Sequence, residues 1–301
     1  MNTKLKYFFL LIIIGLFTSC SKDSNDIDPS EPEYVQIPDT NFETKLISFG
    51  IDSDGVVNQR ILKSDAASVD YLNLSSESIH DEIYDLKGIE GFVNLKRLFA
   101  SGNQLTEVDL SKNILLDSLE LRQNFISTID LLNNSKLLNI DLFSNNLTSI
   151  SGLSSATNLK RLNLSDNLFE EYTIENPSLA HILMSHNELV SFDTSAAVNL
   201  ESIYMPTNKI TELDLSNNTL LELLDVGDNK LTQINFGEIE KITYISCFSN
   251  FLPALDVSNY EALWYLSANR NPNLSCIKIV SGQNIATLKL SDYQQVNVNC
   301  N

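Results

Sequence analysis

The chain has 301 residues, a formal net charge of −19 and four cysteines. A surface this acidic repels nucleic acid and anionic lipid headgroups, so the composition excludes a nucleic-acid-binding role and favours solubility. The charge and the small number of cysteines are compatible with an extracytoplasmic protein.

The first twenty residues predict secretion. Lys4 and Lys6 precede an almost wholly apolar run from Tyr7 to Phe17, and this run is too short to span a hydrocarbon core of roughly 30 Å. Residues 1–19 are therefore predicted to be a signal peptide that is removed on maturation. Cys20 directly follows small residues, which resembles the lipobox of bacterial lipoproteins, although Phe17 stands where that family usually has leucine. The resemblance implies acylation of Cys20 and a lipid anchor in a membrane, whereas the alternative is an ordinary signal peptide with an incidental cysteine.

Residues 20–33 are predicted to form the lipidated cysteine and a flexible tether. The segment is rich in acidic residues, contains two prolines and has one apolar residue after Cys20, so it cannot bury enough surface to offset the entropy lost on ordering. Acidic residues directly after a lipidated cysteine resemble the surface-export signal of Bacteroidota lipoproteins. That resemblance implies an outer-membrane lipoprotein at the cell surface, with periplasmic display as the open alternative.

Residues 34–93 are expected to form an N-terminal cap and a first, irregular repeat. The segment from Ile37 to Gly50 predicts a helix, because Pro38 and Asp39 stand near its start, apolar residues line one side and Gly50 follows it. Asp52-Ser53-Asp54-Gly55 hints at a calcium loop. In an EF-hand register, however, Gly50 and Ile61 would stand at ligand positions, so a turn of the cap is the favoured interpretation.

An internal repeat dominates residues 94–275. Asparagines recur every 20 to 22 residues, and apolar residues precede each of them at fixed offsets in the pattern L-x-x-L-x-L-x-x-N-x-L. The asparagines are Asn103, Asn124, Asn145, Asn167, Asn187, Asn208, Asn229, Asn250 and Asn271. This spacing is the leucine-rich repeat, and it predicts a β-rich α/β solenoid (a horseshoe) with a parallel strand ladder on its concave face.

The residue types of the repeat have a physical reason. L-x-L places two apolar side chains on one face of a short strand, and stacked repeats bury them between neighbouring coils. The asparagine amide can hydrogen-bond the turning backbone inside the coil. Because the repeats are short, we expect turns and extended chain rather than helices on the convex side.

Residues 276–301 are expected to form a C-terminal cap. In an oxidising compartment Cys276 and Cys300 are the natural disulfide pair, whereas Cys247 stands at an inward position of a repeat and is expected to be a buried small hydrophobe.

The chain from Tyr34 to Asn301 resembles leucine-rich-repeat lipoproteins of Flavobacteria and other Bacteroidota. The phrase IPDTNFETKLISFGIDSDG, from Ile37 to Gly55, nearly matches the opening phrase of those proteins, and NPNLSCIKI, from Asn271 to Ile279, matches their ending. The repeats are also similar to those of the internalins, which are bacterial surface adhesins. The resemblance implies a cell-envelope protein that binds partners.

A binding surface is predicted on the concave face, where side chains next to the inward leucines point outward. Leu223, Tyr244 and Tyr265 hold one column in three successive repeats, so the C-terminal half should carry an exposed aromatic patch. Rigid aromatic side chains are enriched at interfaces, but aromatic residues also favour strands in general. The candidate partner-binding residues are Phe99, Phe143, Tyr204, Leu223, Tyr244, Phe248 and Tyr265.

No constellation for catalysis or metal binding is found in the sequence. His181 and His186 lie five residues apart and cannot readily close on one zinc, and no nucleophile motif or phosphate-binding glycine loop is present. The aspartates Asp109, Asp130, Asp193, Asp214 and Asp256 each follow a ladder asparagine by six residues. A calcium ladder is conceivable, but hydrogen bonds within convex turns are the simpler interpretation.

The sequence therefore predicts a non-enzymatic, monomeric envelope lipoprotein that needs no cofactor or metal and binds a protein ligand on its concave face. Capture of a glycan by the aromatic residues, and a structural spacer without a specific ligand, remain the alternatives.

Overall fold

The computed structural model describes residues 33–300, which form one unit. The predicted signal peptide, the acylated Cys20 and nearly all of the tether lie outside the described residues. Within the described part of the chain, no helix is both long and apolar enough to cross a membrane.

The unit begins with a short antiparallel pair of strands and two helices. Strand β1 (Tyr34–Gln36) pairs with β2 (Arg60–Leu62), helix α1 (Thr40–Ser48) lies between them in sequence, and helix α2 (Lys63–Ala67) follows β2. The predicted helix is thus observed, but it starts later because Asp39 is its N-cap, and the Asp39 carboxylate accepts hydrogen bonds from Asn41 N (2.9 Å) and Phe42 N (3.0 Å). Phe42 stacks on Phe92, with ring centroids 6.1 Å apart, and so joins the helix to the first coil.

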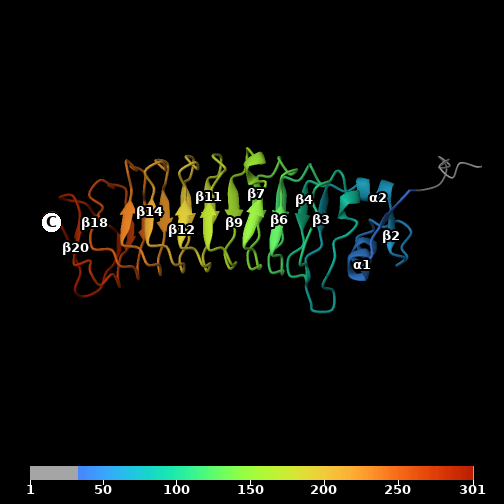
Figure 1. The fold of residues 1–301 in the computed structure, drawn as a ribbon, viewed down its shortest axis with the longest axis horizontal. Coiled ribbons are helices and arrows are strands. Elements are labelled where there is room, and N and C mark those ends of the chain that lie inside the picture. Colours follow the sequence, from blue (N-terminus) through green and yellow to red (C-terminus); the bar gives the residue numbers. More distant parts are fainter. Residues whose placement is uncertain (1–32, 301) are drawn as a thin grey trace, which may run out of the picture. The chain divides into compact units, whose positions relative to one another are not determined.

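An eleven-stranded parallel sheet runs along the repeats, as Figure 1 shows, with each strand contributed by one coil. Its strands in chain order are β3 (Tyr71–Asn73), β4 (Arg97–Phe99), β5 (Ser118–Glu120), β7 (Asn139–Asp141), β9 (Arg161–Asn163), β11 (His181–Leu183), β13 (Ser202–Tyr204), β15 (Leu223–Asp225), β17 (Tyr244–Ser246), β19 (Tyr265–Ser267) and β21 (Thr287–Lys289). In this sheet the central residue of each strand from β3 to β19 is buried, as L-x-L predicts, and the residues on both sides of it are at least partly exposed except Asp225, Ser246 and Ser267. The predicted solenoid with a parallel strand ladder is confirmed.

Extended chain forms short parallel ladders on the opposite side of the coils. These are β6 (Thr128–Asp130) with β8 (Ser149–Ser151), β10 (Glu171–Thr173) with β12 (Ser191–Asp193), β14 (Glu212–Asp214) with β16 (Gln233–Asn235), and β18 (Leu255–Asp256) with β20 (Cys276–Lys278) and β22 (Gln295–Asn297). The remaining helical elements are single 3₁₀ turns at Ile89–Gly91 and Leu153–Ser155. Among the described residues, the convex side therefore consists of turns and extended chain, as expected from the short repeats.

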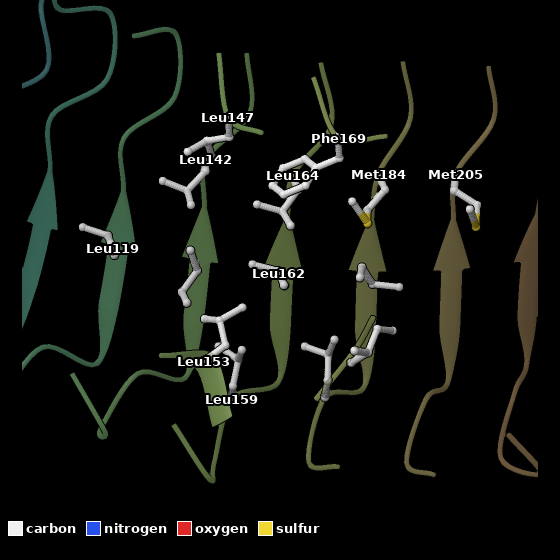
Figure 2. Packing of buried hydrophobic residues seen from close by; sticks show 14 of the residues in the cluster. Leu119, Leu142, Leu147, Leu153, Leu159, Leu162, Leu164, Phe169, Met184 and Met205 are labelled. Carbon is white, nitrogen blue, oxygen red and sulfur yellow. The ribbon is translucent and has the colours of Figure 1, made fainter. Parts of the chain in front are cut away.

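The core is a continuous column of aliphatic side chains between the two sets of strands. In Figure 2, Leu162 projects from β9 into the interior, and Leu142, Leu164, Met184 and Met205 project into it just beyond the ends of successive strands. These side chains are buried to within a few per cent, and each contributes about 1.5–3 kcal/mol relative to exposure.

The ladder asparagines line up inside this column as predicted. In the coil of Asn124, the amide nitrogen Nδ2 donates to Leu121 O of its own coil (3.1 Å) and to Ala100 O of the preceding coil (3.0 Å). The amide oxygen Oδ1 accepts from Leu105 N of the preceding coil (3.1 Å). The same pattern recurs up to Asn271, so the ladder satisfies backbone groups that the turn leaves without strand partners.

The C-terminal segment adds another coil and a covalent link. Strand β21 pairs with β19, and β22 pairs with β20. Cys276 and Cys300 form the predicted disulfide, with Cα atoms 5.7 Å apart.

Candidate functional site

The candidate site lies on the outer face of the eleven-stranded sheet, where side chains stand in columns across the strands. Leu223 is in register with Tyr244, and Tyr244 with Tyr265, so the predicted column is confirmed. A parallel column contains Tyr204 next to Asp225. The C-terminal aromatic patch, as we call it, consists of Tyr204, Leu223, Tyr244, Phe248, Trp264 and Tyr265.

Tyr244 and Tyr265 form the centre of the C-terminal aromatic patch. Their rings are parallel to within 4°, with centroids 4.2 Å apart, because adjacent strands place them directly opposite each other. Trp264 meets both rings edge-on, at 5.9 Å from Tyr244 and 5.7 Å from Tyr265, and 51% of its surface is exposed. The packing of these three rings on one another thus preorganises the centre of the patch.

The ring faces of Tyr265 are more fully occupied than those of Tyr244. Each ring covers one face of the other, and Lys289 Nζ lies 5.3 Å from the centroid of Tyr265. Lys289 also lowers the pKa of Tyr265, whereas burial and the hydrogen bond with Tyr265 raise the pKa of Tyr244. Stacking of a sugar on these rings would require a free ring face, so the geometry favours contacts through edges and hydroxyls.

Phe248, two residues after the end of β17, packs against Gly227. A Cβ atom on Gly227 would lie 2.2 Å from Cε1 of Phe248, so only glycine leaves room for the ring in this position. The guanidinium of Arg270 lies 5.2 Å from the ring centroid of Phe248 and also pairs with Asp228 at 3.7 Å. Phe248 is therefore fixed at the edge of the patch.

Asp225 is a buried carboxylate next to Tyr204, beside the patch. Only 6% of its surface is exposed, and its Oδ1 accepts from Gly227 N at 3.2 Å. Burial raises the pKa of Asp225, and the nearby Asp228 adds to this, while the Gly227 N–H and the Ser246 hydroxyl oppose it. The charge of Asp225 in turn contributes to the raised pKa values of Tyr204 and Tyr244, so all three groups lie close together.

The two candidate phenylalanines of the N-terminal half lie outside this patch. Phe99 stands on β4, where it meets Tyr71 edge-on with ring centroids 5.6 Å apart. Phe143 follows β7, and the guanidinium of Arg122 lies 5.3 Å from the centroid of the Phe143 ring. The structure therefore brings together five of the seven predicted residues and places Phe99 and Phe143 several coils away.

A hollow of about 360 Å³, which we call the polar hollow, extends across the outer face from β4 to β11, with Phe99 in its lining. Its outward-facing lining includes Phe99, Ser118, Glu120, Asn139, Asp141, Arg161, Asn163 and Leu183. Hydrogen bonds hold its carboxylates in place: Asn163 Nδ2 donates to Asp141 (3.1 Å) and Ser101 Oγ donates to Glu120 (3.1 Å). The face thus changes from polar in the middle to aromatic toward the C-terminus.

The aspartates of the convex turns act as turn caps. Their carboxylates accept a hydrogen bond from the backbone N–H two residues later, at 2.8 to 3.0 Å, in all five turns. The interpretation as turn hydrogen bonds is confirmed. Asp54, from the possible calcium loop, likewise accepts from Val56 N (2.9 Å) and Asn58 Nδ2 (2.8 Å).

The two histidines and the free cysteine considered in the sequence are not brought together into one site. His186 is exposed in a left-handed turn, and His181 Nε2 lies 3.8 Å from Glu201. Cys247 is buried, and burial raises the pKa of its thiol to about 12. Within residues 33–300, no group of three or more His, Cys, Asp and Glu side chains is placed to hold a metal ion.

Sequence reasoning missed Trp264 and a second ladder of asparagines. Asn113, Asn134, Asn176 and Asn218 are buried on the convex side and donate to backbone carbonyls of the preceding coil at 2.8 to 3.3 Å. Three of them follow a convex aspartate by four residues, which is a spacing visible in the sequence. Trp264 stands one residue before the outward column, outside the positions that L-x-L marks.

The fold has clear counterparts among solved structures. The functional domain of InlJ from Listeria monocytogenes matches with a TM-score of 0.56 and 22% identity, over 87% of this chain and 72% of that chain. The internalin inlF from Listeria monocytogenes matches with a TM-score of 0.50 and 21% identity, over 87% and 92% of the two chains.

The structure of a plant protein with a bound partner matches as well. The leucine-rich-repeat ectodomain of the receptor kinase GASSHO1/SCHENGEN3 from Arabidopsis thaliana, in complex with CASPARIAN STRIP INTEGRITY FACTOR 2, has a TM-score of 0.52 and 16% identity, over 69% of this chain and 34% of that chain. No family model and no curated protein matches the chain. The structural likenesses establish that residues 33–300 adopt the leucine-rich-repeat solenoid fold found in internalins and receptor ectodomains.

Proposed function

We propose that the protein is a non-enzymatic lipoprotein of the bacterial cell envelope that binds a protein partner through the C-terminal aromatic patch. The observation that carries the proposal is the stack of Tyr244 on Tyr265 with the half-exposed Trp264 beside it. Rigid aromatic side chains with polar tips lose little entropy on contact and dominate the energetics of many interfaces.

Binding, rather than catalysis, is supported by the chemistry of the face. The titratable groups in and beside the C-terminal aromatic patch include its tyrosines, the buried carboxylate of Asp225 and the buried thiol of Cys247, and residues 33–300 place no group of three or more His, Cys, Asp and Glu side chains to hold a metal ion. The solved ectodomain in complex with CASPARIAN STRIP INTEGRITY FACTOR 2 is an example of this fold with a bound partner.

The envelope location is part of the proposal and rests on the sequence. The signal-like run, Cys20 and the acidic segment after it would place the repeats outside the cytoplasm, and the Cys276–Cys300 disulfide is the kind of bond that oxidising compartments maintain. Metabolic labelling with a clickable fatty acid should mark the wild-type protein and not a Cys20→Ser variant. Protease treatment of intact cells would then distinguish surface display, which predicts cleavage, from periplasmic display, which predicts protection.

The binding role is tested with three purified forms of the protein. A Tyr244→Ala/Tyr265→Ala variant should lose a partner that the wild type retains from envelope extract, whereas a Phe99→Ala/Phe143→Ala variant should keep it. Thermal unfolding of all three forms controls for misfolding. Equal retention by all three would remove the C-terminal aromatic patch from the account.

Glycan capture and a purely structural role predict different results. A glycan-capture protein would bind a glycan array through Trp264, because this side chain is half exposed whereas Tyr265 has Tyr244 on one face and Lys289 near its ring, and it would lose this binding on Trp264→Ala. A spacer would retain neither proteins nor glycans. We therefore treat both as outcomes that would replace the proposed protein-binding role.

A further inference from the structure

Beside the rings of the C-terminal aromatic patch lies a buried carboxylate, Asp225, that has no cationic partner among residues 33–300. The ion pairs of residues 33–300 include Asp141 with Arg122 and Asp228 with Arg270, but none includes Asp225. Arg270 is already engaged by Asp228 and Phe248, and Lys289 lies over Tyr265. An ionised carboxylate is costly to bury unless it is paired or fully hydrogen-bonded.

The local structure does not require a charge at this position. Asp225 accepts a hydrogen bond from the backbone N–H two residues later, and the same column repeats this arrangement at Asn73, Asp141 and Asn163. An asparagine oxygen therefore makes the turn as well as a carboxylate does. The negative charge of Asp225 is not explained by the turn.

The surroundings of Asp225 are those of a site for a cation. Tyr204, which is 40% exposed, stands beside it in the column, and Tyr244 and Leu223 belong to the neighbouring column. A cation that approached the carboxylate would meet the exposed ring of Tyr204 at the same time, and a cation–π contact strengthens when it is desolvated. The net charge of −19 would attract basic partners over a longer range.

We propose that Asp225, between Tyr204 and Tyr244, receives an arginine or lysine side chain of the partner protein. This inference rests on the proposed function and specifies the chemistry of the partner: a basic side chain flanked by apolar contacts. The incoming guanidinium or ammonium supplies the missing counter-charge, while Leu223 and the ring edges contact its neighbours.

The test uses two short peptides that differ only in charge. Ac-Gly-Leu-Arg-Leu-Gly-amide is compared with the same peptide containing citrulline, whose side chain is nearly isosteric with arginine but neutral. Dissociation constants are measured by NMR titration for the wild type, Asp225→Asn and Asp141→Asn. The last variant is a matched control, because Asp141 makes the same turn hydrogen bond but pairs with Arg122 and lies in the polar hollow.

The wild type and Asp141→Asn should prefer the arginine peptide by roughly tenfold, and Asp225→Asn should reduce this preference to less than about twofold. A preference that Asp225→Asn leaves unchanged, or no preference in the wild type, would overturn the inference.

A Tyr204→Ala/Tyr244→Ala variant separates this inference from the proposed function. If both peptides bind equally to the wild type and this variant loses them, the aromatic patch binds ligands but the cation site is wrong. If this variant binds both peptides as the wild type does, the patch is not the binding surface and both proposals fail.

Discussion

Removing one rung of the asparagine ladder should destabilise the whole solenoid. Asn145 is 7% exposed, and its amide donates to Leu121 O (2.9 Å) and Leu142 O (3.1 Å) and accepts from Ile126 N (3.1 Å). In Asn145→Ala, the two carbonyls each keep one amide donor, from Asn124 and Asn167, whereas Ile126 N–H loses the acceptor that the ladder supplies.

The expected loss follows from these bonds. One buried N–H left unsatisfied costs about 1–3 kcal/mol, and each carbonyl that loses one of two bonds adds about 0.5–1 kcal/mol. We therefore expect Asn145→Ala to lower the free energy of unfolding by roughly 2–5 kcal/mol. Asn146→Ala is the matched control, because Asn146 is the next residue and is exposed, and it should change the free energy by less than about 0.5 kcal/mol.

Urea unfolding followed by circular dichroism measures both variants, since the transition midpoint and its slope report stability and cooperativity separately. A loss for Asn145→Ala no larger than that for Asn146→Ala would refute the reasoning, because the buried amide would then contribute nothing to the fold.

Three further results are expected. The Asp52 carboxylate is 4% exposed and its oxygens have no hydrogen-bond partner, so burial raises its pKa above the ordinary 3.8. Asp52→Asn should therefore stabilise the fold at pH 7, and this gain should decline as the pH falls through the folded pKa and vanish below about pH 3.8. A constant gain between pH 3 and 7 would exclude burial of the charge as the cause. Cys247, with a pKa of about 12, should resist iodoacetamide at pH 8 until the chain unfolds, and rapid labelling of native protein would contradict its burial. Cys300→Ser should lower the unfolding free energy by about 3–4 kcal/mol on the chain-entropy model, and an unchanged urea midpoint would show that the Cys276–Cys300 bond does not stabilise the last coil.

Most of the fold could be predicted from the sequence because one physical pattern is repeated many times. The period of about 21 residues, the inward L-x-L positions and the ladder asparagines specify where each coil turns and what it buries. The second asparagine ladder was harder to predict. Its members recur in only some coils, and in others Ala197 or Tyr260 stands four residues after the convex aspartate.

The candidate site could be predicted only in part. Column membership follows from the period, so Leu223, Tyr244 and Tyr265 were placed correctly. The contacts of Trp264 with Tyr244 and Tyr265 depend on the orientation of its side chain at the start of a strand. The lack of a cation beside Asp225 depends on the positions of Arg270 and Lys289 in neighbouring coils. Such relations between coils are not expressed in a repeat pattern.

The central claim, that the outer face of the eleven-stranded sheet is the binding surface, is tested most directly by site-specific photocrosslinking in intact cells. A photoreactive amino acid is placed at Tyr204 on β13 or, as the matched position on the opposite side of the coils, at Glu212 on β14, both exposed. The account predicts a discrete crosslinked partner from position 204 and none from position 212. A partner captured from position 212 alone would contradict it.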